Sequence, residues 1–161
     1  MAVETEVLNE LHRLRARVPQ LTGALAASTD GLVLAQDMPD VQPEGLAALT
    51  AAALGVGRRM VDLSVGGEFC ELLVRGAGGC LATYAAGPSA VLTLVAGDRV
   101  NVGRLHLEGR RSGARIGALM ATRTTGERSP GGGGKPNGRP PGARGPGALP
   151  VRIPPQSRHR P

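Results

Sequence analysis

The sequence predicts an α/β protein of the α+β type, with the order helix, strand, strand, helix, strand, strand, strand, helix and a disordered tail. Three segments repeat apolar residues at helical spacing. Five shorter apolar segments lie between them and are separated by turn sequences. Because strands joined by tight turns run in opposite directions, the sheet should be antiparallel.

The first helix is predicted over residues 3–17, where one stripe of apolar residues recurs at spacings of four, three and four. Pro19 should end this helix, since proline and the residue before it disfavour helical conformation. The stripe consists of Val7, Leu11, Leu14 and Val18.

Two antiparallel strands should follow, over residues 22–28 and 32–35. Asp30-Gly31 lies between them and is a strong signal for a two-residue hairpin, because both residue types tolerate positive φ.

The middle helix is predicted over residues 43–63, with Pro43 in its first turn and Glu44 at the positive end of its dipole. A core-facing stripe and a second smooth surface make it apolar over more than one face, so we expect it to pack on the sheet and on something else. The stripe comprises Leu46, Leu49, Ala53, Val56, Met60 and Leu63, and the smooth surface Ala47, Ala48, Ala51, Ala52 and Gly55.

Three further strands are predicted over residues 68–75, 80–86 and 90–96, and a last helix over 101–121 with Asn101 as its N-cap. Apolar residues on both faces of the last two strands suit a sheet covered on both sides. Glycines at four-residue spacing in the last helix would permit close packing, either on the sheet or on a partner. They are Gly109, Gly113 and Gly117.

The charge is divided unevenly along the chain. Residues 1–121, the predicted domain, carry 11 arginines and 12 carboxylates, a net charge of −1. Residues 122–161 carry eight basic residues and one glutamate, a net charge of +7, with nine glycines and nine prolines. Such a segment cannot bury enough apolar surface to order itself, so we predict a disordered basic tail.

Several local sequences, in this order and spacing, resemble the Roadblock (dynein light chain) superfamily over residues 4–120. They are Val18-Pro-Gln-Leu-Thr-Gly-Ala-Leu25, Ser28-Thr-Asp-Gly-Leu32, Pro43-Glu-Gly-Leu-Ala-Ala-Leu49, Leu72-Leu-Val-Arg-Gly76, Ala90-Val-Leu-Thr-Leu94 and Asn101-Val-Gly-Arg-Leu105. The chain looks especially like the short bacterial members that are encoded beside a sensor histidine kinase and a Ras-like GTPase.

This resemblance implies a five-stranded antiparallel sheet, with the middle helix on one face and the terminal helices on the other. It implies a homodimer built by residues 43–63 and 68–75, which binds a Ras-like small GTPase, regulates it, and belongs to a complex with a sensor histidine kinase. The family has no catalytic motif, so we expect no enzyme. The candidate dimer or partner interface comprises Ala48, Ala52, Gly55, Arg58, Arg59, Phe69 and Glu71.

The residues give little support for catalysis, metal binding or phosphate binding. We expect no catalytic residue, cofactor or metal: the histidines lack ligands at suitable spacing, and Cys70 and Cys80 should point to opposite faces of neighbouring strands. Gly131–Gly134 with Lys135 lacks the Ser or Thr of a phosphate-binding loop. Four carboxylates, Glu68, Glu71, Asp98 and Glu108, are interpreted as solvated surface charges.

An alternative function is tail-mediated binding of nucleic acid or an anionic membrane, weak and sensitive to salt. Without a signal peptide or an apolar run of about 20 residues, the expected location is the cytoplasm. A second expected location is the inner face of the cell membrane, where the protein would associate peripherally.

Overall fold

The computed structural model describes residues 2–127, and the side chains as far as residue 123. The predicted tail lies outside these residues, apart from its first positions. The observed elements are α1 (Ala2–Arg17), β1 (Leu21–Ser28), β2 (Val33–Asp37), α2 (Pro43–Ser64), β3 (Glu71–Gly76), β4 (Gly79–Ala86), β5 (Ala90–Gly97) and α3 (Val102–Glu127). The predicted order is confirmed, and α3 continues six residues beyond its predicted end at 121.

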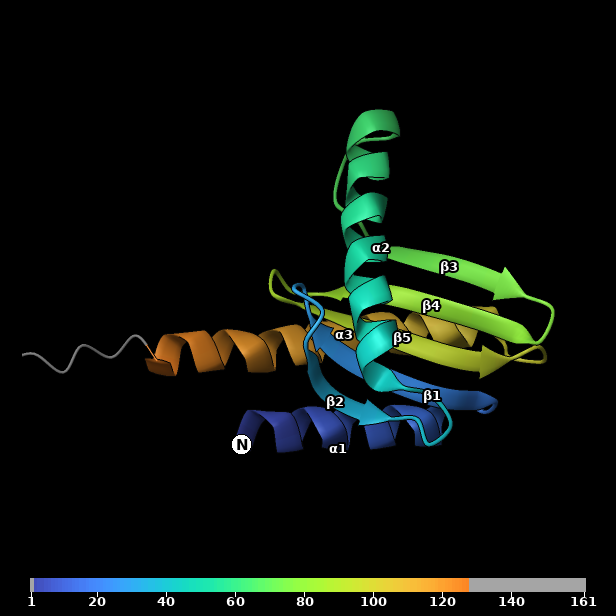
Figure 1. Cartoon of the computed structure of the whole chain (residues 1–161), viewed down its shortest axis with the longest axis horizontal. Helices are drawn as coiled ribbons and strands as arrows, with labels where there is room; N and C mark the ends of the chain where they lie inside the picture. Colours follow the sequence, from blue (N-terminus) through green and yellow to red (C-terminus); the bar gives the residue numbers. More distant parts are fainter. Residues whose placement is uncertain (1, 128–161) are drawn as a thin grey trace, which may run out of the picture. The chain divides into compact units, whose positions relative to one another are not determined.

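All five strands form one antiparallel sheet in the order β2-β1-β5-β4-β3. Helix α2 crosses one face, and α1 and α3 lie on the other, as Figure 1 shows. Alternate residues of each strand therefore enter two different cores. On β1, for example, Ala24 and Ala26 belong to the α1/α3 core, while Leu25 and Ala27 belong to the α2 core.

The α1/α3 core contains the larger side chains. The predicted stripe of α1 is buried, with Val7, Leu11 and Leu14 fully covered. Tyr84 on β4 lies beneath α3, where its hydroxyl lies 3.0 Å from His106 Nδ1 and 3.3 Å from the carbonyl oxygen of Leu105. The predicted N-cap of α3 is also present, since Asn101 Oδ1 accepts from the amide of Arg104 at 2.9 Å.

The glycine stripe of α3 packs on the sheet. A Cβ at Gly109 would lie 2.5 Å from the Tyr84 ring, and a Cβ at Gly117 would lie 2.8 Å from the amide nitrogen of Gly87. These separations are too short for any side chain larger than hydrogen. Packing of α3 on the sheet of the same chain therefore accounts for the glycine stripe, which is the first of the two interpretations given above.

The buried face of α2 differs from the predicted one. Leu49, Val56, Met60 and Leu63 are exposed, while the helix buries Ala47, Thr50, Leu54 and Gly57. Both sets have helical periodicity, so spacing could not distinguish them. The set with more small residues faces the sheet because it lets the helix backbone approach closely.

Two strand predictions also need correction. Strand β3 begins at Glu71 and not at residue 68, because Phe69 turns away to pack on α2, its ring 2.5 Å from where a Cβ of Gly57 would lie. The β1–β2 turn is longer than two residues: the amide of Ser28 donates to the carbonyl of Leu32, and Gly31, not Asp30, has positive φ.

Replacing Gly109 with alanine should destabilise the fold by about 1–2 kcal/mol. A Cβ only 2.5 Å from the Tyr84 ring should incur the upper part of the usual overpacking cost, about 2–3 kcal/mol, and better helix propensity returns about 1 kcal/mol. Urea unfolding measures the change. Gly45→Ala is the control, since a Cβ at Gly45 meets open space and should leave stability unchanged or slightly raised. Equal stabilities for Gly109→Ala and wild type would contradict the packing argument.

Candidate functional site

The outer face of α2 carries four of the exposed large hydrophobic side chains of residues 2–127. Its large side chains are 60–71% exposed: Leu49, Val56, Met60 and Leu63. Ala48, Ala52 and Gly55, all named in the sequence-based interface, lie exposed on the same helix. We call these seven residues the outer face of α2. Contiguous exposed apolar surface of this kind marks interaction sites in folded proteins.

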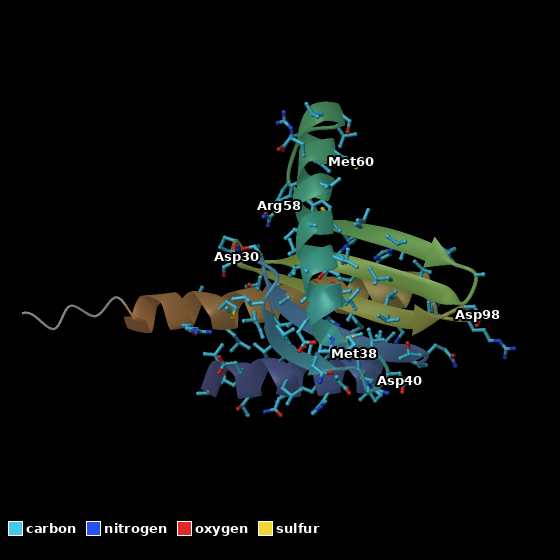
Figure 2. The ribbon with its side chains drawn as sticks, in the orientation of Figure 1. Asp30, Met38, Asp40, Arg58, Met60 and Asp98 are labelled. Carbon is cyan, nitrogen blue, oxygen red and sulfur yellow. The ribbon has the colours of Figure 1, made fainter. Side chains whose placement is uncertain are left out.

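Helix α2 also extends beyond the sheet. Figure 1 shows that it crosses the strands and continues past the edge strand β3. Figure 2 places Met60 on this projecting part. The exposed Val65 follows the helix, and Val74, 53% exposed, lies on β3 itself. The projecting half of α2 and the edge of β3 therefore form one continuous unpartnered region within residues 2–127.

The other predicted interface residues take different positions. Arg59 is exposed, Arg58 is half-buried, and neither has an ion-pair partner among the described side chains. Phe69 is buried against α2, so it can support this surface but does not present itself to a partner. Glu71 is half-buried and faces Arg110.

A cavity of about 570 Å³ lies beside the start of β3. It brings Arg58 together with Phe69, Cys70, Tyr84 and Arg110. Arg58 lies on α2 and Arg110 on α3, so both faces of the sheet contribute to this cavity at the β3 edge. The lining combines these two arginines with Glu68 and several apolar side chains.

Glu71 anchors Arg110 at the edge of this cavity. Arg110 Nε donates to Glu71 Oε2 at 3.0 Å, and Arg110 Nη2 donates to Glu71 Oε1. These hydrogen bonds hold the pKa of Glu71 below its usual value, against the opposing effect of burial. Burial raises the pKa of Tyr84 next to it, so its phenol stays protonated. Glu71 is therefore not the solvated surface charge that the sequence predicted.

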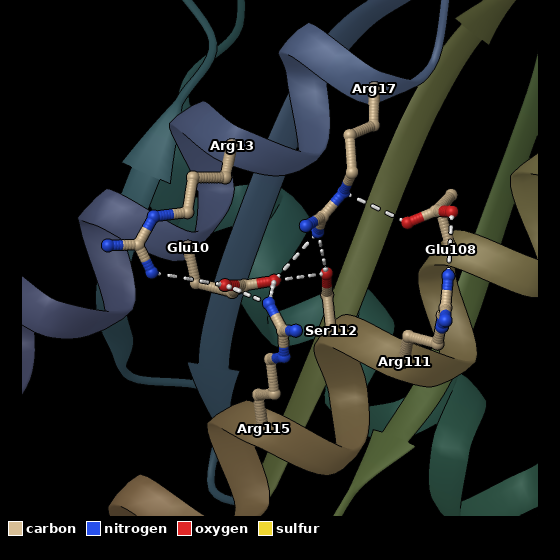
Figure 3. A network of polar contacts seen from close by, with 7 residues as sticks. All are labelled: Glu10, Arg13, Arg17, Glu108, Arg111, Ser112 and Arg115. Carbon is tan, nitrogen blue, oxygen red and sulfur yellow. Dashed lines mark hydrogen bonds and ion pairs between the residues drawn. The ribbon is translucent and has the colours of Figure 1, made fainter.

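A second polar cluster joins α1 to α3, as Figure 3 shows. Ser112 Oγ donates to Glu10 Oε1 at 2.6 Å, and Arg115 Nη1 donates to Glu10 Oε2 at 3.2 Å. Arg17 links the two carboxylates of the cluster: its Nη2 donates to Glu10 Oε1 at 2.9 Å, and its Nε lies 2.9 Å from Glu108 Oε2. Glu10 and Glu108 are both buried.

Sequence reasoning missed this cluster. It interpreted Glu108 as a solvated charge and gave Glu10 no role. A signal was present, since Glu10 lies on the buried side of α1, three residues after Val7 and four before Leu14. Burial acts to raise the pKa of Glu10, but hydrogen bonds from Ser112, Arg17 and Arg115 outweigh it and lower the pKa.

The two cysteines of residues 2–127 lie apart from each other. Cys70 is exposed and Cys80 buried, and both are free thiols. Cys70 precedes β3 and so does not pair with β4 as predicted, whereas Cys80 lies opposite Arg75. No group of three or more His, Cys, Asp or Glu in this part of the chain could hold a metal ion. None of its helices has the length and hydropathy needed to cross a bilayer.

The structure is that of a small α+β domain in which one helix face, on α2, and one edge strand, β3, are open to a partner. The sequence matches the model of the Roadblock/LC7 domain over residues 7–96, more than half of the chain. The protein therefore belongs to the Roadblock/LC7 family. No curated protein sequence matches it.

Three solved structures illustrate the shared fold. A Roadblock/LC7 domain from Streptomyces avermitilis is 24% identical, with a TM-score of 0.66 over 71% of this chain and 97% of that one. MglB in a tetrameric arrangement is 22% identical, with a TM-score of 0.70, and covers 76% and 93%. The gliding protein MglB from Thermus thermophilus is 22% identical, with a TM-score of 0.69 and the same coverage.

Glu10→Gln should destabilise the protein by about 2 kcal/mol at neutral pH, because Arg17, Ser112 and Arg115 lose the buried carboxylate to which they donate. The pKa of Glu10 is lower in the folded than in the unfolded chain, where it is near 4.5. The unfolded chain therefore binds the proton first, and the stabilisation is lost as pH falls below about 4.5. Urea unfolding at several pH values measures both effects.

Glu6→Gln, on an exposed position of the same helix, is the control and should change stability by less than about 0.5 kcal/mol. A difference between wild type and Glu10→Gln that is the same at pH 7 and pH 4 would count against a charged role for Glu10.

Proposed function

We propose that this protein is a homodimeric, non-catalytic regulator that binds a Ras-like small GTPase. The observation that carries the proposal is the outer face of α2, which projects beyond its own sheet. Membership of the Roadblock/LC7 family supports a regulatory role, and the resemblance to family members encoded with a GTPase indicates the class of partner.

The edge strand supports a second copy of this chain as the occupant of the projecting surface. Strand β3 is at one end of the sheet, so its outer N–H and C=O groups lack partners within residues 2–127. Such an edge is a template for pairing with another strand. Antiparallel pairing of two β3 strands about a two-fold axis would extend the sheet into the partner.

This arrangement also explains why α2 overhangs. The partner's strands would lie beneath the projecting half of α2, where the chain itself supplies Phe69 against Gly57 but no strand beyond β3. The two α2 helices would lie near the axis and could bury Ala52, Val56 and Met60 against each other. Arg58 and Arg59 lie at the border of this region and are available to an acidic surface of a third protein.

This protein would either contact the switch regions of the GTPase or hold the GTPase in a larger complex. Association with a sensor histidine kinase follows from the same resemblance and is part of this proposal. Tail-mediated contact with nucleic acid or membrane is the alternative, and it concerns residues outside those described.

Ala52→Glu should convert the dimer into a folded monomer, because it places a charge in the centre of the apolar interface. The side chain is exposed in the single chain, so the fold should survive. Light scattering after gel filtration gives the mass. Ala16→Glu makes the same change at an exposed position of α1 and should leave the dimer intact. A monomeric wild type contradicts the proposed interface.

Mixing the protein with a Ras-like GTPase of the kind encoded beside similar family members should give a complex that contains two copies of this chain. The GTPase is loaded separately with GDP and with a non-hydrolysable GTP analogue, and the complex should form with one nucleotide in preference. Gel filtration with light scattering measures its composition. No complex in either nucleotide state would overturn the GTPase assignment while leaving the dimer to be judged by Ala52→Glu.

A further inference from the structure

The outer surface of α1 and α3 presents cations above buried anions. In the cluster of Figure 3, the side chains of Arg13, Arg111 and Arg115 are 58–68% exposed. Their partners Glu10 and Glu108 are 3% and 10% exposed. A molecule that approaches this surface therefore meets guanidinium groups first. Since Arg17 also belongs to the cluster, four arginines share two carboxylates, and the cluster has a net positive charge.

An exposed leucine lies among arginines on the same surface. Leu107 on α3 is 55% exposed. Arg104 precedes it by three residues, and Arg110 and Arg111 follow it by three and four, so all three are its neighbours on the helix surface. Each is exposed, and Arg104 has no ion-pair partner among the described residues. We call Leu107, Arg13, Arg17, Arg104, Arg111 and Arg115 the basic helical face.

The exposed acids of α1 lie toward the other end of the layer. Helices α1 and α3 run antiparallel, since Arg17 at the end of α1 meets Glu108 early in α3, and Arg123 meets Glu4. Glu4 therefore lies near the C-terminal half of α3, and Glu6 lines a pocket with Arg13 and Arg115 that does not include Leu107. Leu107 is in its first turns, where arginines dominate.

The chemistry of this face fits an anionic bilayer better than a nucleic acid. Apolar side chains among arginines on an interfacial helix bury into the headgroup region while the cations contact anionic lipid. Binding of single-stranded nucleic acid relies instead on exposed aromatic side chains. The sequence has one Phe and one Tyr, and both are buried elsewhere.

We propose that the basic helical face binds anionic phospholipid headgroups, with Leu107 entering the membrane interface. Helices α1 and α3 lie side by side on one face of the sheet and α2 lies on the opposite face, as Figure 1 shows. A membrane bound at this face leaves the outer face of α2 accessible. The family match ends at residue 96, so α3, which supplies most of this face, is outside it.

Sedimentation of the full chain with vesicles tests the proposal. The vesicles contain phosphatidylcholine alone or phosphatidylcholine with phosphatidylglycerol. Binding should require phosphatidylglycerol and weaken with salt. Each arginine near an anionic surface contributes about fivefold in affinity, so the Arg104→Gln/Arg111→Gln double variant should bind about twentyfold more weakly.

The matched control removes the same charge from the tail. Arg139→Gln/Arg144→Gln should reduce binding less than about threefold if the helical face provides the main contact. Equal or greater loss in this tail variant overturns the proposal in favour of the tail. If Arg104→Gln/Arg111→Gln binds the vesicles as tightly as the wild type does, the proposal is also overturned. It is overturned as well if duplex DNA binds through these arginines and the vesicles do not bind.

Fluorescence tests the insertion of Leu107 separately. The chain has no tryptophan, so Leu107→Trp introduces a single reporter. Its emission should shift to the blue with phosphatidylglycerol vesicles and stay unchanged with phosphatidylcholine alone. Leu32→Trp, at a 68% exposed position in the β1–β2 turn, is the control and should not shift. A shift at residue 32 but not at residue 107 overturns the assigned surface.

Discussion

The contact between the ring of Tyr84 and the backbone of α3 determines how one half of the molecule is arranged. Tyr84 is the largest fully buried side chain among the described residues, and α3 lies directly on it because Gly109 has no side chain. The height and angle of α3 then bring Ser112 and Arg115 to Glu10 of α1. Because α1 meets α3 through these polar groups, its position depends indirectly on the space that one tyrosine occupies.

Small residues organise the other half of the molecule in a different way. Helix α2 faces the sheet with mostly small residues, including Ala47 and Gly57, and with one large side chain, Leu54. Four other large apolar side chains face outward: Leu49, Val56, Met60 and Leu63. The backbone of α2 thus lies close to the sheet on one side, and the helix presents an exposed apolar surface on the other. In a chain with one Phe and one Tyr, this division leaves much of the large apolar area on the surface and less of it in the core.

Local pattern was sufficient for the element order and for the antiparallel sheet, since each strand and helix has its own periodicity. The layer arrangement came from the family resemblance and was confirmed. Pattern failed for α2, where two faces have equally good helical spacing and only the sheet distinguishes Thr50 from Leu49.

The local sequence pattern also failed to predict the Glu10 cluster. Ser112 lies 102 residues away from Glu10 in the sequence, and no local signal connects the two residues. In the candidate interface, the pattern selected several positions that lie exposed on α2, among them Ala48, Ala52 and Gly55. It could not foresee that Phe69 would turn inward to support α2 or that Arg110 would hold Glu71.

The overhang of α2 has a consequence for how the protein behaves at different abundances. In a lone chain the projecting half of α2 has few tertiary contacts, chiefly those of Gly57 and Val61 with the cluster that contains Phe69, and short helical segments are marginal in water without packing. If two chains pair there as proposed, the order of this segment depends on mass action: dilute chains would fray there, and concentrated chains would not. A cell could thus adjust the amount of competent surface through the level of expression alone, without any ligand or chemical modification.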